Sequence, residues 1–224
     1  MQAVILAGGR GIRLGGMTNR LPKPMIDVNG RPFLEHLIMN LKENGIKDIV
    51  ICAGYLHQKM VDYFKDGSIL GVKITFSIEK KILGTGGALK NAKRFLNRNF
   101  FLINGDTYLP IDYKSAWMRF RRLHKKGLIV LCRDKDRNGN ASVQENLVTR
   151  YDKKSKGMDF TDAGLQIFSR DVLKMIPKNC TFSLENKIFQ KLSRQGQMVA
   201  YITDKRFYDM GTLEGLRIIR GILK

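Results

Sequence analysis

The feature that most constrains this chain is an apolar run near its start that ends abruptly in a glycine-rich loop. The run Val4–Ala7 is followed by Gly8, Gly9 and Gly11, and Arg13 comes close behind. The run predicts a buried strand, and the glycines let the main chain approach a ligand closely. Successive N–H groups in such a turn form a concavity for anions, and an arginine fork matches phosphate geometry. The loop predicts a phosphate or nucleotide site, and an ordinary tight turn is an equally good interpretation of the loop alone.

Two familiar phosphate loops are excluded here. No Gly-Lys-Ser/Thr follows the glycines, so the loop is not a Walker A motif. The dinucleotide fingerprint needs a third glycine where Leu14 stands, and prolines arrive at Pro22 and Pro24, soon after the point where that motif needs a helix.

The composition indicates one globular domain, residues 1–224, with anionic partners. Hydrophobic residues make up 43%, and 40 Lys and Arg against 20 Asp and Glu give a net charge of +20. The densest basic run, 119–126, contains Phe120 and Leu123, which favours the solvated face of an amphipathic helix over a nucleic-acid surface. No nucleic-acid partner is expected, and the oligomeric state stays open, a homo-oligomer included.

The three cysteines have no spacing that suggests a disulfide framework or a zinc cluster. No segment is apolar for long enough to span a bilayer, and the first apolar run is too short for a signal peptide. A cytoplasmic protein is therefore expected.

Strand-like and helical patterns alternate along the chain, which predicts an α/β fold with a mostly parallel sheet covered on both faces. Ligands bind such sheets at the carboxyl ends of the strands. Four polar clusters fall there: 8–13, 79–87, 104–106 and 208–211. The expected strands are 4–7, 48–53, 72–78, 100–103, 128–132 and 198–202. The expected helices are 32–44, 56–64, 86–96, 185–194 and 212–223, with one more near Val172 and one before residue 128. Further strands near 142–151 and 165–168 are expected to form a small antiparallel extension.

Three charged residues in these regions suggest phosphate chemistry. Asp106 and Asp209 each follow a predicted strand, and two carboxylates together suit Mg²⁺, although a lone aspartate more often serves a turn. Lys23 lies between two prolines, which stiffen its backbone. The lysine is then either an ammonium group held in place for a phosphate or an incidental residue of a rigid surface turn.

Glu79 bears on the choice of base. A carboxylate only accepts hydrogen bonds, and guanine offers two adjacent N–H donors where uracil and thymine offer one. Glu79 favours guanine if it faces a base; otherwise it is a strand-end charge paired with Lys80 or Lys81.

Together these motifs resemble the sugar-1-phosphate nucleotidylyltransferases, in the right order and over nearly the whole chain. The motifs are 6–14, 22–24, 84–88, 104–106 and 209–212. The resemblance implies a Rossmann-like nucleotidyltransferase (GT-A-like) fold, in which a mixed, mostly parallel sheet is flanked by helices. It also implies Mg²⁺, a nucleoside triphosphate and a sugar 1-phosphate. The short length and residues 77–80 are similar to the D-glycero-α-D-manno-heptose 1-phosphate guanylyltransferases, which implies GTP and a GDP-heptose for surface glycans.

The resemblance also implies residue roles. Arg13, Lys23 and Asp106 are catalytic, and Asp106 and Asp209 hold the metal. The nucleotide contacts Leu6, Ala7, Gly8, Gly9, Gly11, Arg13, Lys23, Glu79, Gly84, Thr85, Gly86, Gly105 and Asp106; the sugar phosphate contacts Lys153 or Lys154, Asp162, Gly164 and Glu185.

Three positions depart from the family pattern. Ile12 stands where a threonine is usual, 162–164 reads Asp-Ala-Gly in place of Asn-Ala-Gly or Asn-Gly-Gly, and Lys153 lacks the usual preceding glutamate.

Several alternatives remain open. Mannose 1-phosphate, glucose 1-phosphate and N-acetylmuramate 1-phosphate compete as sugars, and uridylyl, thymidylyl or cytidylyl transfer competes with guanylyl transfer. A glycosyltransferase would use Asp134 and Asp136 as an Asp-x-Asp metal motif, and a non-catalytic sugar-nucleotide binder would not need all of Arg13, Lys23 and the two metal-site aspartates.

Overall fold

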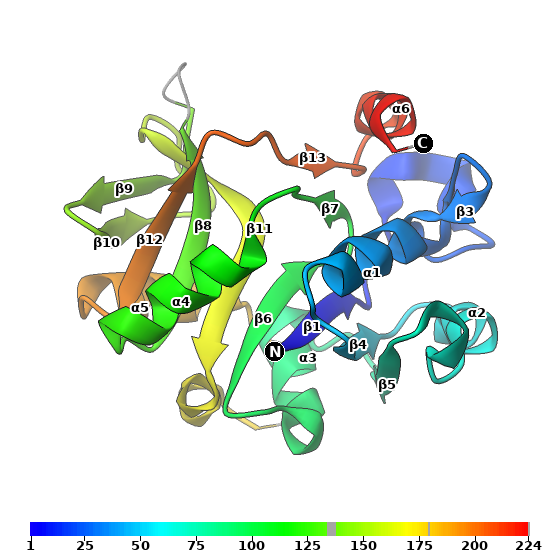
Figure 1. Ribbon diagram of the computed structural model, residues 1–224, viewed down its shortest axis with the longest axis horizontal. Helices are drawn as coiled ribbons and strands as arrows, with labels where there is room; N and C mark the ends of the chain where they lie inside the picture. The colour runs from blue at the N-terminus through cyan, green and yellow to red at the C-terminus, as the bar shows by residue number, and fades with distance from the viewer. Residues whose placement is uncertain (134–137, 179, 224) are drawn as a thin grey trace.

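In the computed structural model, which describes residues 1–133, 138–178 and 180–223, a nine-stranded mixed sheet runs through the molecule (Figure 1). In spatial order its strands are β5 (Lys73–Ile78), β4 (Asp48–Ala53), β1 (Gln2–Ala7), β6 (Asn99–Asn104), β11 (Phe160–Ser169), β8 (Gly127–Arg133), β12 (Met198–Thr203), β10 (Leu147–Tyr151) and β9 (Ala141–Gln144). The α/β fold expected from the alternating patterns is confirmed.

The sheet changes direction at its centre. Strands β5, β4, β1 and β6 are mutually parallel, as expected of apolar strands that helices connect. Strand β11 runs antiparallel to both neighbours, β6 and β8. The expectation that 165–168 belongs to a peripheral antiparallel extension is therefore wrong, because this strand bridges the two halves of the sheet. The extension itself consists of β9 and β10, which pair antiparallel at one edge.

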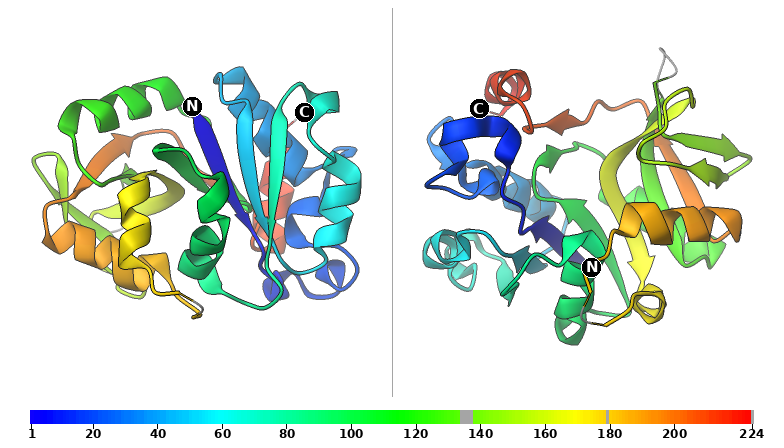
Figure 2. Two further views of the ribbon diagram at one scale, coloured as in Figure 1. Left: turned by 90° about the horizontal axis from the view of Figure 1, so that it is seen from below. Right: turned by 180° about the vertical axis from the view of Figure 1, so that it is seen from behind.

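Helices cover both faces of the sheet. On one face pack α1 (Phe33–Glu43), α2 (His57–Phe64) and α4 (Tyr113–Leu123), whose buried side chains share a core with β1, β4 and β6. The other face, seen from behind in Figure 2, carries α3 (Gly84–Asn91) and α5 (Gln190–Arg194). In α4, Phe120 is buried while Arg121 and Arg122 are exposed, which confirms the solvated face predicted for the basic run.

Some expected helices have other geometries. The helix expected over 86–96 is α3 followed by the 3₁₀ turn η4 (Ala92–Phe95), and the one near Val172 is the 3₁₀ helix η5 (Arg170–Met175). The one expected over 185–194 begins as a π-helix, η6 (Leu184–Phe189), and continues as α5. The remaining short elements are η1 (Ile12–Thr18), η2 (Lys23–Met25), η3 (Ser68–Leu70) and the hairpin β2 (Asp27–Val28) with β3 (Arg31–Pro32).

A small ladder next to the sheet holds the C-terminal part against the N-terminal part. Strand β7 (Thr107–Tyr108) pairs antiparallel with β13 (Tyr208–Asp209), so that Asp209 lies opposite Thr107. The helix α6 (Leu213–Ile222) follows, and its Leu216 and Ile219 pack in a third core cluster with Leu14. The ladder thereby carries a carboxylate from near the end of the chain to the end of β6. Within the described ranges, no helix combines the length and apolar character needed to cross a bilayer.

Candidate functional site

Two adjoining cavities lie at the carboxyl ends of β1 and β6. The larger, of about 510 Å³, borders the glycine loop and the start of α3, and the smaller, of about 250 Å³, borders β11 and β10. Both fall at the edge of the sheet where parallel strands end, as sheet topology predicts. Residues that line both cavities are Leu6, Arg13, Thr85, Asn104, Asp106, Lys153 and Glu185.

The glycine loop shapes the larger cavity through close backbone approaches. Gly11 has a φ of 65°, and a Cβ there would lie 2.8 Å from Cβ of Lys23, so glycine alone fits this turn beside the lysine stem. A Cβ on Gly8 would lie 2.5 Å from Oε1 of Glu79. The loop thus packs directly against both a cation and a carboxylate.

Lys23 is the charged centre of the site. Its side chain is 8% exposed, and its Nζ lies 2.5 Å from Oδ2 of Asp106 and 3.7 Å from Oδ1 of Asp209. The flanking prolines and the turn η2 fix the backbone of Lys23, as the sequence predicted. The two aspartates, far apart in the sequence, therefore meet at one ammonium group.

Local hydrogen bonds hold the carboxylate of Asp209. The Gly211 N–H donates to its Oδ1 at 2.7 Å, and the Met210 N–H donates to the Asp106 carbonyl oxygen at 3.0 Å. Gly211 also lies against Arg13, because a Cβ at Gly211 would be 2.8 Å from an Arg13 guanidinium nitrogen. Arg13 and both carboxylates thus belong to one charged cluster.

Glu79 lies at the wall of the larger cavity, just beyond the end of β5. The Leu83 N–H donates to its Oε2 at 3.3 Å, and burial raises the pKa of Glu79 above its usual value despite that hydrogen bond. Oε1 faces the glycine loop at Gly8. The carboxylate therefore has acceptor capacity directed at the cavity.

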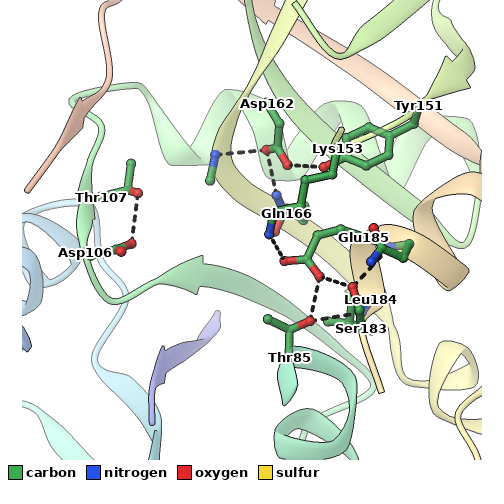
Figure 3. A network of polar contacts seen from close by, with 12 residues as sticks. Thr85, Asp106, Thr107, Tyr151, Lys153, Asp162, Gln166, Ser183, Leu184 and Glu185 are labelled. Atoms are coloured by element: carbon green, nitrogen blue, oxygen red, sulfur yellow. Dashed lines mark hydrogen bonds and ion pairs between the residues drawn. The ribbon is translucent and has the colours of Figure 1, made fainter. Parts of the chain in front are cut away.

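Glu185 connects the two cavities (Figure 3). Its Oε2 accepts hydrogen bonds from the hydroxyls of Thr85 at 2.7 Å and Ser183 at 2.8 Å, and its Oε1 pairs with Nζ of Lys153 at 2.9 Å. Burial raises the pKa of Glu185, but the bonds from Thr85 and Lys153 outweigh burial and hold it below its usual value. The sequence has no glutamate directly before Lys153, and Glu185 from η6 supplies the carboxylate that pairs with this lysine.

Asp162 carries a second polar network, at the floor of the smaller cavity (Figure 3). Tyr151 Oη donates to Oδ2 of Asp162 at 3.0 Å, and Gln166 Nε2 and the Gly164 N–H each donate to Oδ1 at 2.9 Å. Burial raises the pKa of Asp162 to about 6, against the effect of these donors. All three donors thus bind one carboxylate, which fixes the side chains of Tyr151 and Gln166 in the lining of the smaller cavity.

Most predicted site residues line these cavities. The exceptions are Gly86, which is buried with its N–H bonded to the Phe182 carbonyl, and Lys154, which is exposed with its N–H bonded to Asp152. The side chain of Ile12 and the pair Asp134 and Asp136 lie outside the described parts of the chain. The ligand contacts themselves stay predictions.

Sequence reasoning missed Tyr151 and Gln166, which line the smaller cavity. A signal existed for Gln166, since it is a polar residue inside an apolar strand, is 3% exposed, and needs a buried partner. Tyr151 carried no comparable signal, because its partner Asp162 is in another strand.

Asp106 and Asp209, which lie together beside Lys23, are the carboxylates expected to hold a cation. Among the described residues, no group of three or more His, Cys, Asp or Glu side chains is arranged to hold a metal ion. Two carboxylates without further protein ligands match Mg²⁺, which keeps several waters and binds substrate phosphates as its other ligands.

The fold and the site define an α/β protein whose larger cavity is lined by the buried cation Lys23 and by a glycine loop whose backbone can approach a phosphate closely. The chain belongs to the nucleotidyl transferase family, whose model matches residues 2–220.

Comparison with known proteins agrees with this assignment. The chain is 34% identical to the D-glycero-α-D-manno-heptose 1-phosphate guanylyltransferase of Campylobacter jejuni, over 96% of each chain. It is 31% identical to the mannose-1-phosphate guanylyltransferase of Mycobacterium tuberculosis, over 99% of this chain and 66% of that one. The crystal structure of HddC from Yersinia pseudotuberculosis in complex with GMP-PN superposes with a TM-score of 0.85 at 31% identity, covering 100% of this chain and 99% of that one.

The raised pKa of Asp162 leads to a prediction about stability. Its folded pKa of about 6 exceeds the usual 3.8, so the folded state binds the proton more tightly between these values. The contribution of Asp162 to the free energy of unfolding should therefore fall as pH rises through this window, by about 2 to 3 kcal/mol. Asp162→Asn should remove that fall, as measured by urea unfolding at closely spaced pH values. Asp171→Asn is the control, because Asp171 is exposed with a lowered pKa. A fall of equal size in Asp162→Asn would contradict the prediction.

Proposed function

We propose that this protein transfers a guanylyl group from GTP to D-glycero-α-D-manno-heptose 1-phosphate, which yields GDP-heptose and pyrophosphate. The observation that carries the proposal is the arrangement of two cavities that meet at Asp106 and Arg13, with Lys23 bordering the larger one. A triphosphate fits the glycine-loop side and a sugar phosphate fits the Lys153 side. The reaction is assigned to the cytoplasm, because the three cysteines are free thiols, as in a reducing compartment.

The reaction needs no protein nucleophile. A phosphate oxygen of the sugar 1-phosphate attacks the α-phosphorus of GTP in line. As that bond forms, the bond from the α-phosphorus to the oxygen bridging to the β-phosphate breaks, and pyrophosphate leaves with that oxygen. Catalysis is then positioning and charge stabilisation, in which Lys23 and Arg13 offset charge on the phosphates.

Asp106 and Asp209 would hold a Mg²⁺ ion, because these two carboxylates lie together beside Lys23, Asp106 lining both cavities and Asp209 the smaller one. When bound, the ion supplies Lewis-acid polarisation of phosphate oxygens and offsets the repulsion between two anionic substrates. The Gly211 N–H and the β7–β13 ladder keep Asp209 beside Asp106.

The smaller cavity would bind the sugar phosphate. Lys153 supplies the cation, and Glu185 orients its ammonium through the 2.9 Å ion pair. Asp162 and the backbone at Gly164 border the sugar hydroxyls. Lys154 has no part in this proposal, because it does not line the cavity.

A mannose 1-phosphate guanylyltransferase is the second candidate, and the similarity to the Mycobacterium tuberculosis relative favours it. Mannose and the heptose share the configuration of the ring, so the lining described above suits both. Guanine is supported by Glu79 in either case.

The first test is a panel of four nucleoside triphosphates against the 1-phosphates of heptose, mannose, glucose and N-acetylmuramate, with Mg²⁺ and with pyrophosphate release as the readout. The highest kcat/KM is expected for GTP with the heptose 1-phosphate. A preference for mannose 1-phosphate would select the second candidate, and no pyrophosphate release from any pair would overturn the proposal.

Asp106→Asn should lower kcat by about 100- to 1000-fold with the preferred substrates, because it removes one of two carboxylates while conserving shape. Circular dichroism should stay that of the wild type, because Asp209 still pairs with Lys23. Asp171→Asn, at the far edge of the sheet, is the matched control and should retain activity. Near-normal turnover of Asp106→Asn would contradict the metal assignment.

Glu79→Gln should lower kcat/KM for GTP by about 10- to 100-fold, since the amide can accept only one of the two guanine N–H bonds. The wild type should also prefer GTP to ITP, which lacks the 2-amino group, and the variant should lose that preference. An unchanged ratio of GTP to ITP in Glu79→Gln would show that this carboxylate does not contact the base.

A further inference from the structure

A third cavity lies at the opposite edge of the sheet from the nucleotidyl transfer site. It has a volume of about 390 Å³, and we call it the distal basic cavity. Arg98, which lines it, directly precedes β6, whereas Asp106 follows the same strand. The six residues of β6 separate the two edges by about 20 Å. The lining residues are Lys90, Lys93, Arg98, Ser169, Arg170, Asp171, Leu173 and Lys174.

The cavity concentrates positive charge, most of which has no counter-charge among the residues that the structure describes. Five of its lining residues are cationic and one, Asp171, is acidic; Asp171 pairs with Lys174 at 2.6 Å on the exposed rim. For Lys90, Lys93, Arg98 and Arg170, the described residues provide no carboxylate within ion-pair distance. Like charges gathered in one recess repel, so a bound anion would relieve a cost that folding leaves in place.

Lys90 shows this cost most directly. Its Nζ donates to the Leu173 carbonyl oxygen at 2.5 Å, which fixes the ammonium at the cavity wall. Partial burial, followed by the charges of Lys93 and Lys178, lowers the pKa of Lys90. The ammonium is therefore positioned without a counter-charge from the described part of the chain.

Backbone contacts build the walls. The Arg170 guanidinium donates to the Lys93 carbonyl oxygen at 2.8 Å, and the Arg170 N–H donates to the Arg98 carbonyl oxygen at 2.8 Å. The side chains of Lys93 and Arg98 take no part in these bonds, and both are exposed. They are available to a ligand, and truncating them leaves the walls intact.

We propose that the distal basic cavity is a second anion site, which binds a small soluble molecule with at least two phosphate groups. Two arginines and three lysines supply more charge than a single phosphate needs, and guanidinium groups match phosphate oxygens in fork geometry. The volume falls in the range of small-molecule sites. A lipid headgroup shares this chemistry, and the experiment separates the two sources.

Titration calorimetry with tripolyphosphate, in EDTA to exclude divalent metals, tests the proposal without nucleotide turnover. Its result is therefore independent of the reaction proposed above. Lys93→Ala/Arg98→Ala should weaken binding at least about tenfold, because two charge-assisted contacts are lost. The matched control, Lys114→Ala/Arg121→Ala, removes the same charges from exposed positions of α4 and should bind as the wild type does. Arg13→Ala, which removes an exposed cation from the catalytic cavities, should also retain binding, which marks the site as separate from the catalytic one.

Two results would overturn the proposal. One is wild-type affinity in Lys93→Ala/Arg98→Ala, and the other is loss of binding in Arg13→Ala with an unchanged thermal unfolding midpoint. A lipid partner would appear as co-sedimentation with phosphatidate vesicles that depends on Lys93 and Arg98, in the absence of tripolyphosphate binding, and this too would overturn a soluble ligand.

Discussion

The site depends on one buried ammonium. Lys23 is 8% exposed and touches carboxylates from two distant segments, one after β6 and one from β13. A cation so placed loses hydration, and removing its partners would leave a buried charge uncompensated, which is strongly destabilising. The interaction therefore couples the N-terminal loop, the central strand and the C-terminal ladder. The chemistry of the site and the closure of the fold at its C-terminal end rest on the same three side chains.

The sequence predicted the local structure of the first half well, because each parallel strand there is a short apolar run followed by turn residues. The strand expected over 48–53 has those bounds in the structure, and the family, the glycine loop and the cluster of strand ends were all predicted. The position of β11 was not. Its apolar pattern predicts a strand, but the choice of β6 and β8 as partners is a long-range property that periodicity does not encode.

The same limit applies within the site. Glu185 was expected near the sugar phosphate through the resemblance alone, and Lys153 lacked a glutamate in its own segment. The structure pairs these two residues across 32 positions of sequence. A carboxylate that accepts bonds from Thr85 and Ser183 while holding Lys153 ties the start of α3 to η6. Spacing rules find contacts within one helix or loop, so a pair of this kind becomes visible only when the fold is known.

The helix α3 connects the pair formed by Lys153 and Glu185 to the distal basic cavity. Its first turn carries Thr85, which bonds Glu185, and its last turn carries Lys90, which lines the distal basic cavity. The five-residue interval spans about 7.5 Å of helix, so one short element contributes side chains to both the nucleotidyl transfer site and the distal basic cavity. The second wall of that cavity, η5, leads through the chain to Ser183 and Glu185. A ligand in the distal basic cavity would change the affinity of the nucleotidyl transfer site only if the relative position of these two segments differed between the free and the bound states, which is the condition for any linked pair of sites.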